Sequence, residues 1–144
     1  MFIGEYQHSI DKKGRIAVPF RFRKNLSDGA VVAKGLVDNC LSIYPKKEWE
    51  ILSAKLAALP ISDKKARAFT RLMFSGAVEV DFDQQGRILL PAYLREYAGI
   101  NSQAIIAGVY NRVEIWDEKN WEDYKKLSEN ESDDISTHMQ ELGV

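Results

Sequence analysis

The sequence predicts an α+β fold, mainly β, made of two tandem copies of one strand–turn–strand–helix unit. The motif D-x-x-G-R occurs twice, 72 residues apart. Apolar and polar residues alternate ahead of each copy, as in a half-buried strand, and a proline follows each copy where a helix can begin. A unit of about 45 residues rarely buries enough apolar surface to fold alone, so we expect one shared core and an internal pseudo-two-fold axis.

The match between the two copies continues beyond the motif at the same offset. Four blocks align in register: residues 4–19 with 76–91, Arg23 with Arg95, 41–44 with 113–116, and 47–50 with 119–122. Between these blocks Gly35 matches Gly108 only if one residue is inserted, which we expect in a loop. The chain is therefore expected to have four parts: repeat 1 (5–47), a helical connector (48–75), repeat 2 (76–119), and a C-terminal helix followed by an acidic, disordered tail (120–144).

Each unit is expected to open with a strand and a tight turn. Tyr6, His8 and Ile10 alternate with polar residues, and the second copy repeats this alternation. Aspartate suits the first position of a turn and glycine the fourth, which assigns turns to 11–14 and 83–86. Further strands are expected at 16–18, 31–33 and 41–44 in repeat 1 and at 88–90, 105–107 and 113–116 in repeat 2, with short helices after Pro19 and Pro91 that end by Gly29 and Gly99.

The connector between the repeats is expected to contain two helices. Apolar residues recur at steps of three and four from Trp49 to Leu59, and Pro60 ends this run. A second helix is expected to start at Ser62 or Asp63, either of which can cap it, and to continue through 69–73. The segment that follows Leu127 is too polar to pack well, and we expect it to be frayed or disordered.

Composition excludes several classes of protein. No apolar run is long enough to span a membrane, and no secretory signal is visible, so we expect a cytoplasmic protein. The single cysteine, Cys40, allows no intramolecular disulfide and no cysteine cage, and it has no neighbouring histidine or acid that would make it a nucleophile. No nucleotide-binding or hydrolase motif is present. We therefore predict no catalytic residues, no metal site and no cofactor.

Charge is distributed unevenly although the net charge is only −1. Residues 1–26 carry six basic residues and two acidic ones, whereas residues 117–144 carry nine acidic residues and three basic ones. A basic region on a nearly neutral protein favours an anionic partner. The alternative is that the two ends simply have differently charged solvated surfaces.

The D-x-x-G-R turn is the main candidate for a functional site. Turn chemistry alone accounts for Asp11 and Gly14, and for their second-copy counterparts Asp83 and Gly86. It does not require the arginines that follow, Arg15 and Arg87. An arginine fork suits phosphate or the edge of guanine, so each turn can present an arginine to DNA, with the aspartate fixing its direction. A purely structural pairing of Asp and Arg explains the residues about equally well.

The two turns differ in the residues at their tips. The first carries Lys12 and Lys13, whereas the second carries Gln84 and Gln85 and lies beside several acidic residues. If the partner is DNA, the first turn should supply most of the attraction to phosphate. The predicted DNA-binding residues are Lys12, Lys13, Arg15 and Arg87.

These residues carry a family resemblance. The segments 11–19 and 83–91 resemble the D-x-x-x-R motif of AbrB/SpoVT-like DNA-binding domains, and the doubling, the opening M-F-I-G-E-Y and the length resemble the MraZ family. The resemblance implies a double swapped-hairpin β-barrel with connecting helices. It implies a nucleoid-associated repressor that binds short, G-rich direct repeats in the promoter of its own division and cell-wall gene cluster. It also implies assembly into a ring of many subunits.

Two other functions stay open. Antitoxins use the same barrel, but they usually hold one copy and a C-terminal segment that masks a toxin, whereas here the copy is doubled and the tail is short and acidic. An oligomeric scaffold without DNA binding is the other alternative. No residue set supports an enzyme.

Overall fold

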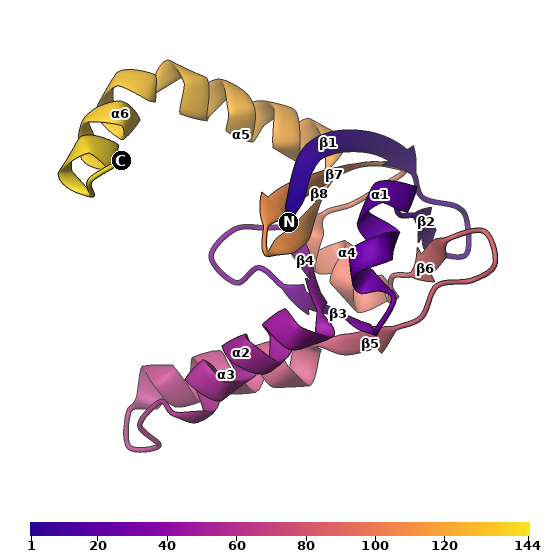
Figure 1. Ribbon diagram of the computed structural model, residues 1–144, viewed down its shortest axis with the longest axis horizontal. Coiled ribbons are helices and arrows are strands. Elements are labelled where there is room, and N and C mark those ends of the chain that lie inside the picture. The colour runs from indigo at the N-terminus through magenta and orange to yellow at the C-terminus, as the bar shows by residue number, and fades with distance from the viewer.

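Two strand-rich repeats joined by a helical hairpin make up the computed structural model, which describes residues 1–144 (Figure 1). The strands are β1 (Phe2–Ser9), β2 (Arg15–Ala17), β3 (Ala30–Lys34), β4 (Leu41–Pro45), β5 (Val78–Val80), β6 (Arg87–Leu89), β7 (Gln103–Tyr110) and β8 (Arg112–Asp117). The helices are α1 (Phe20–Arg23), continued by a 3-10 turn (Lys24–Leu26), α2 (Lys46–Ala57), α3 (Lys64–Gly76), α4 (Ala92–Ala98), α5 (Glu118–Asn130) and α6 (Ser132–Glu141). The predicted α+β class and the two repeats are confirmed.

The two repeats exchange their first strands. A six-stranded antiparallel sheet has the order β1-β7-β8-β4-β3-β5, and β2 and β6 form a separate two-stranded sheet. Strand β1 of repeat 1 pairs along its whole length with β7 of repeat 2, and β5 of repeat 2 pairs with β3 of repeat 1. Neither repeat can therefore complete its sheet without the other, which is why one unit of this size does not suffice.

The pairing register reveals an internal pseudo-two-fold axis. In the small sheet Ile16 lies opposite Ile88, and in the large sheet Ser42 of β4 lies opposite Glu114 of β8. Both pairs join residues that are equivalent in the two repeats. The axis therefore passes through the β2–β6 and β4–β8 pairs, as the duplication predicts.

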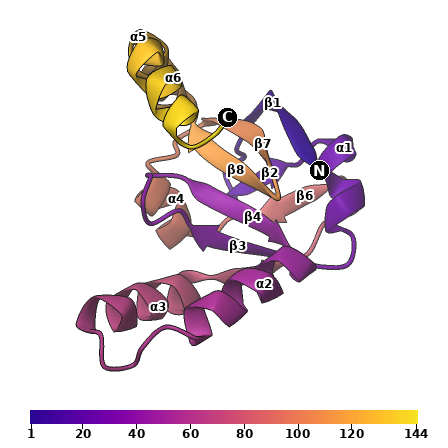
Figure 2. The same ribbon diagram turned by 60° about the vertical axis from the view of Figure 1, so that its left-hand side comes forward.

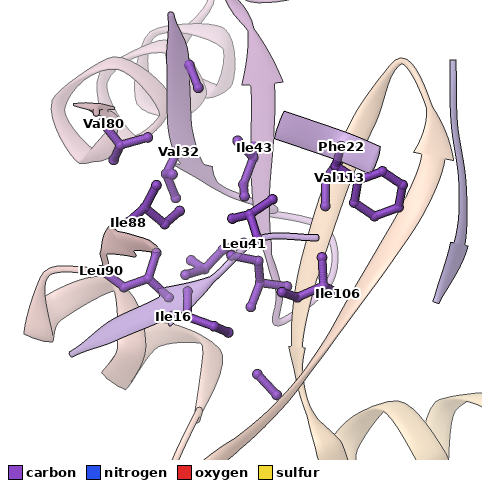
Figure 3. Close-up of a cluster of buried hydrophobic side chains, with 14 of the residues drawn as sticks. Ile16, Phe22, Val32, Leu41, Ile43, Val80, Ile88, Leu90, Ile106 and Val113 are labelled. Atoms are coloured by element: carbon purple, nitrogen blue, oxygen red, sulfur yellow. The ribbon is translucent and has the colours of Figure 1, made fainter. Parts of the chain in front are cut away.

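One hydrophobic core serves both repeats. Nineteen buried residues form a single cluster that includes Ile16 and Ile88 of the small sheet and Leu41 and Ile106 of the large one. Figure 3 shows these side chains converging between the two sheets. Phe22 of α1 closes one side of the cluster, with its ring edge-on to the ring of Tyr6 at a centroid distance of 5.4 Å. The expected shared core is confirmed.

The helical connector forms as two antiparallel helices. Helix α2 ends before Pro60, and α3 begins after Asp63, whose carboxylate accepts a hydrogen bond from the Ala66 N–H at 2.9 Å and so caps the helix. Trp49 of α2 packs against Phe74 of α3 at a centroid distance of 5.9 Å. Both predicted helices are present, and they project away from the sheets as a hairpin (Figure 2).

The structure differs from the sequence alignment between the blocks. Lys34 pairs with Leu41, and Gly108 pairs with Val113, which is the equivalent of Leu41. Gly108 therefore corresponds to Lys34 and not to Gly35. The offset between equivalent residues of the two repeats here differs from 72 by two residues, whereas the sequence alignment suggested a difference of one. The physical reason is the tight turn between β7 and β8, where Tyr110 adopts a left-handed φ of 62°.

The polar C-terminal segment also differs from the expectation of disorder. It forms α6 over Ser132–Glu141, although no residue of α5 or α6 is buried. Asp133 and Asp134 lie in the first turn of α6, where carboxylates favour the helix dipole. Low hydrophobicity therefore indicated correctly that this segment does not join the core, but it did not preclude a helix.

Candidate nucleic-acid interface

The two D-x-x-G-R turns lie at one end of the molecule, on either side of the β2–β6 pair (Figure 1). Each glycine carbonyl accepts a hydrogen bond from the other repeat: Gly86 O from the Val18 N–H at 3.0 Å, and Gly14 O from the Leu90 N–H at 2.9 Å. The two turns are consequently tied into one unit, and the sequence prediction that they occupy equivalent places about the axis is matched by these bonds.

Each aspartate organises its own turn. One carboxylate oxygen of Asp11 accepts hydrogen bonds from the N–H groups of Lys13 and Arg15, both at 2.9 Å, and the other accepts from Arg15 Nε at 2.7 Å. Asp83 repeats this pattern with Gln85 and Arg87. The aspartate therefore shapes the turn and also pairs with the arginine that follows it, as the structural interpretation of the motif expects.

The hydrogen bonds to the aspartates leave much of each guanidinium free. Both contacts engage Nε, and the terminal nitrogens of Arg15 and Arg87 make no hydrogen bond within the chain. The Arg15 and Arg87 side chains are about one-third and one-quarter exposed. The terminal N–H donors are the part of the fork that can reach an external anion.

Both arginines lie on the same outward face of the β2–β6 pair. Ile16 and Ile88 point into the core, so their neighbours along each strand point the other way. Arg15 lies opposite Leu89, and Arg87 lies opposite Ala17, which makes the arginines diagonal neighbours on the order of 7 to 8 Å apart at the backbone. Arg87 Nη1 also lies 3.6 Å from the Asp11 carboxylate of the other repeat. The two arginine–aspartate pairs therefore form one cluster across the β2–β6 pair.

Two further arginines hold the turns from the opposite repeat. The guanidinium of Arg95, on α4, lies over Gly14, where an added Cβ would be 2.9 Å from its Cζ atom, and Arg23, on α1, lies over Gly86 in the same way. Arg95 Nε donates to Leu90 O at 2.9 Å, whereas Arg23 Nε is buried without a partner. Both glycines have positive φ, which favours glycine, and an added Cβ at either position would displace the guanidinium that covers it.

Hydrogen bonding within the turns lowers the pKa of both aspartates. For Asp11 the main cause is the bond from the Arg15 backbone N–H, and for Asp83 it is the bond from the Arg87 N–H. A carboxyl group whose pKa is lower in the folded than in the unfolded chain stabilises the fold. This contribution is fully present at pH values above the ordinary aspartate pKa of 3.8. That contribution is lost as the pH falls through the lower folded pKa.

We therefore expect the doubly substituted chain Asp11→Asn/Asp83→Asn to lose less stability in acid than the wild type. The melting temperature of the wild type should fall below about pH 4 more steeply than that of the variant, because the variant has no carboxylate to protonate at the turns. Thermal unfolding across pH 2 to 7 measures this. Asp133→Asn/Asp134→Asn is the control, and an equal acid dependence in all three chains contradicts the prediction.

Comparison with known proteins identifies the family. The sequence model of one family, described as "MraZ protein, putative antitoxin-like", matches residues 1–72 and again residues 73–142. This chain belongs to the MraZ family. It is 51% identical to the transcriptional regulator MraZ of Alkaliphilus oremlandii, 49% to that of Acetivibrio thermocellus and 47% to that of Halothermothrix orenii, each over 144 residues and the full length of both chains.

Each of the two segments matched by the family model contains one D-x-x-G-R turn. Each also contains one of the two arginines, Arg23 and Arg95, that cover a turn glycine. The sequence pointed to Arg15 and Arg87, and the structure brings them together on one face. The sequence assigned no role to Arg23 and Arg95, which cover the glycines of the opposite repeat. The signal was available, since these two arginines align in the duplication, but their contacts cross between repeats and no local pattern reveals that.

The other reactive groups of this MraZ-family chain lie away from the turns. Cys40 is buried, and its burial raises the pKa of the thiol to about 12, with further contributions from Glu114 and Asp38. The thiol is therefore protonated at neutral pH. No three side chains of His, Cys, Asp or Glu gather as metal ligands, and no helix is both long and apolar enough to cross a membrane.

Proposed function

We propose that this chain is a DNA-binding transcriptional regulator that contacts DNA through Arg15 and Arg87. The observation that carries the proposal is the shared outward face of β2 and β6, where aspartates bind the Nε of two guanidinium groups whose terminal nitrogens make no hydrogen bond within the chain. The fork of arginine matches the O6 and N7 acceptors of guanine and the oxygens of phosphate. The relatives' printed name, transcriptional regulator MraZ, supports the same function.

We further propose that it represses the promoter of its own division and cell-wall gene cluster, in the cytoplasm at the nucleoid, by binding short direct repeats. One pair of turns makes few phosphate contacts and so binds weakly. A ring of copies, each meeting one repeat about one helical turn from the next, gains affinity by effective concentration. The strand exchange between the repeats supports the swapped-hairpin barrel as the scaffold that presents the turns.

The strand exchange also distributes the positive charge between the two turns. The neutral second turn, with Gln84 and Gln85, lies under Arg23 of α1, and the same helical segment carries Arg21 and Lys24. The sequence suggested that the second turn contributes less to phosphate attraction. The contact of Arg23 with Gly86 instead supports a nearly even division, with Lys12 and Lys13 on one side and the basic segment of α1 on the other.

Binding to the chain's own upstream DNA tests the proposed function. Fluorescence anisotropy should show tight binding to a labelled upstream duplex and much weaker binding to an unrelated duplex of the same length and composition. Affinity for both should fall steeply with salt, because bound phosphates release counterions. Equal affinity for the two duplexes would show that the chain binds DNA without sequence specificity. Absence of binding at low salt would contradict the proposed DNA-binding function.

The salt dependence tests how charge is shared. Lys12→Gln/Lys13→Gln should lower the slope of log affinity against log salt by about 1 to 2, because each lost phosphate contact removes about 0.9. Arg21→Gln/Lys24→Gln, which removes the same charge beside the second turn, should lower it by a similar amount. If the second variant keeps the wild-type slope, the first turn supplies most of the phosphate contacts.

An antitoxin-like function is the second candidate, because the family description contains that word. It predicts a small protein partner that binds tightly and masks the acidic C-terminal helices. Co-expression with the neighbouring small open reading frames, followed by purification, distinguishes the two functions. A stable stoichiometric partner that blocks DNA binding would favour the antitoxin-like function. Assembly without any DNA binding would favour a scaffold.

A further inference from the structure

The outward face of the β2–β6 pair carries an exposed apolar side chain beside its arginines. Leu89 of β6 lies directly opposite Arg15 of β2, and both side chains point away from the core. Leu89 is 55% exposed, whereas its neighbour Ile88 is buried. Leu89 therefore adds apolar surface to the face through which the chain is proposed to contact DNA.

Leu89 and Arg15 are close neighbours across the strand pair. The N–H of Arg15 donates to the Asp11 carboxylate, and the carbonyl of Arg15 accepts from the Asp11 N–H, so neither group bonds to Leu89. Opposite residues without mutual backbone hydrogen bonds are the closest pairs of an antiparallel ladder. Their Cβ atoms are about 4.5 to 5.5 Å apart. A ligand that reaches the Arg15 guanidinium consequently also meets Leu89.

The fold does not require a leucine at this place. The equivalent residue of repeat 1 is Ala17, which lies opposite Arg87, and the shared core forms with alanine there. A single exposed leucine is common on protein surfaces and by itself needs no explanation. Leu89 differs because it neighbours both arginines, with Arg15 across the pair and Arg87 two residues earlier on the same face of β6.

The chemistry of this face matches the major groove of DNA. That groove admits a two-stranded β-ribbon, and β2 and β6 form such a ribbon. Guanine displays two acceptors in the groove, O6 and N7, which suit an arginine fork. Thymine displays its C5 methyl group there, which suits an apolar side chain, and the minor groove does not show this methyl group. An arginine beside a leucine therefore fits a guanine near a thymine.

We propose that Leu89 contacts the C5 methyl group of a thymine that lies about one or two base pairs from the guanine contacted by Arg15. The spacing follows from the separation of the two side chains, because successive base pairs are about 3.4 Å apart along the DNA axis. This inference rests on the proposed function and adds a base to those that the ribbon recognises. Ala17, opposite Arg87, is too short to make the equivalent contact.

The proposed contact makes the two halves of the ribbon unequal. Arg15 lies opposite a leucine, whereas Arg87 lies opposite an alanine. A protein with two-fold symmetry favours a palindromic site, because equivalent groups meet equivalent bases. Leu89 breaks the pseudo-two-fold symmetry at the face itself, so each copy has a preferred orientation on DNA and recognises an element that is not palindromic. Short direct repeats, which the proposed function invokes, are elements of this kind.

Removal of single methyl groups from the DNA tests the contact. Each thymine of the upstream duplex is replaced in turn by deoxyuridine, which keeps the base pair and lacks only the C5 methyl group. Fluorescence anisotropy should show that wild-type affinity falls about fourfold at one thymine of each bound element, as expected for one buried methyl-sized group. Leu89→Ala should bind the unmodified duplex more weakly than the wild type does, and it should not distinguish thymine from deoxyuridine at that position.

Leu127→Ala is the matched control for the loss of a leucine side chain. Leu127 is 58% exposed, but it lies on α5, away from the turns. The control should keep the wild-type preference for thymine over deoxyuridine. Leu89→Ala should keep the wild-type melting temperature, since the side chain that it shortens is exposed.

Two results would overturn the inference and leave the arginine contacts in place. One is a wild type that binds every deoxyuridine duplex as tightly as the unmodified duplex, which is also the result expected if Leu89 inserts between bases as a wedge. The other is a Leu89→Ala chain that keeps the full preference for thymine. A wild type that binds none of the duplexes contradicts the DNA-binding function itself, and the contact of Leu89 with thymine is then wrong as well.

Discussion

Substitution Arg15→Ala should abolish specific binding to the upstream DNA while leaving the fold intact. Arg15 is the only side chain of the first turn that Asp11 holds in place and that keeps free donors toward solvent. Loss of one bidentate contact with guanine costs about 1 to 3 kcal/mol, which is roughly 5- to 150-fold in affinity. Several copies on one DNA segment multiply this loss, so we expect a decrease of more than about 100-fold.

A matched arginine provides the control. Arg112 of β8 is also about one-third exposed and also binds a carboxylate two positions away, Glu114 at 3.1 Å, but it lies outside the turns. Arg112→Ala should therefore change affinity less than about twofold, while Arg87→Ala should resemble Arg15→Ala because both arginines share one face. Anisotropy titration with upstream DNA measures all three. If Arg15→Ala keeps the wild-type affinity for the upstream DNA, the proposal that the turns contact DNA is wrong.

Substitution Gly86→Ala should destabilise the chain and weaken DNA binding together. Gly86 has a φ of 73°, which costs an alanine about 1 to 2 kcal/mol, and an added Cβ would collide with the Arg23 guanidinium. Displacement of a packed side chain typically adds about 1 to 3 kcal/mol. For a chain of this size we expect the melting temperature to fall by roughly 5 to 15 °C.

Gly99→Ala separates the two causes of this loss. Gly99 has a similar φ of 63°, but the nearest atom to an added Cβ is the Asn120 side chain at 3.5 Å, an ordinary contact. It should therefore show the backbone cost alone and keep DNA binding. Adding Arg23→Ala to Gly86→Ala should recover part of the stability, since the collision is then removed. Equal melting temperatures for Gly86→Ala and Gly99→Ala would contradict a role for Arg23.

Much of the fold follows from local patterns in the sequence. The aspartate and glycine of each motif specify the turns, and Asp63 marks the start of α3. These features depend on residues close together in the chain, so a single sequence reveals them. The duplication adds the pseudo-symmetry, because equivalent residues must occupy equivalent environments.

Contacts between the repeats could not be derived in this way. Alternation of polar and apolar residues predicts a strand, but it does not say that β1 pairs with β7 of the other repeat. The positions of Arg23 and Arg95 depend on that exchange. For the same reason the sequence could not show that the basic helix α1 lies beside the second turn.

Footprinting on the DNA upstream of the chain's own gene tests the central claim most directly. If the arginine turns read short direct repeats from an assembly of copies, the protein should protect several short segments about one helical turn (~10 bp) apart, with guanines at the protected positions. Arg15→Ala should remove this protection at the same protein concentration. Protection that is absent, or that spreads evenly without regard to sequence, would contradict sequence-specific recognition by the turns.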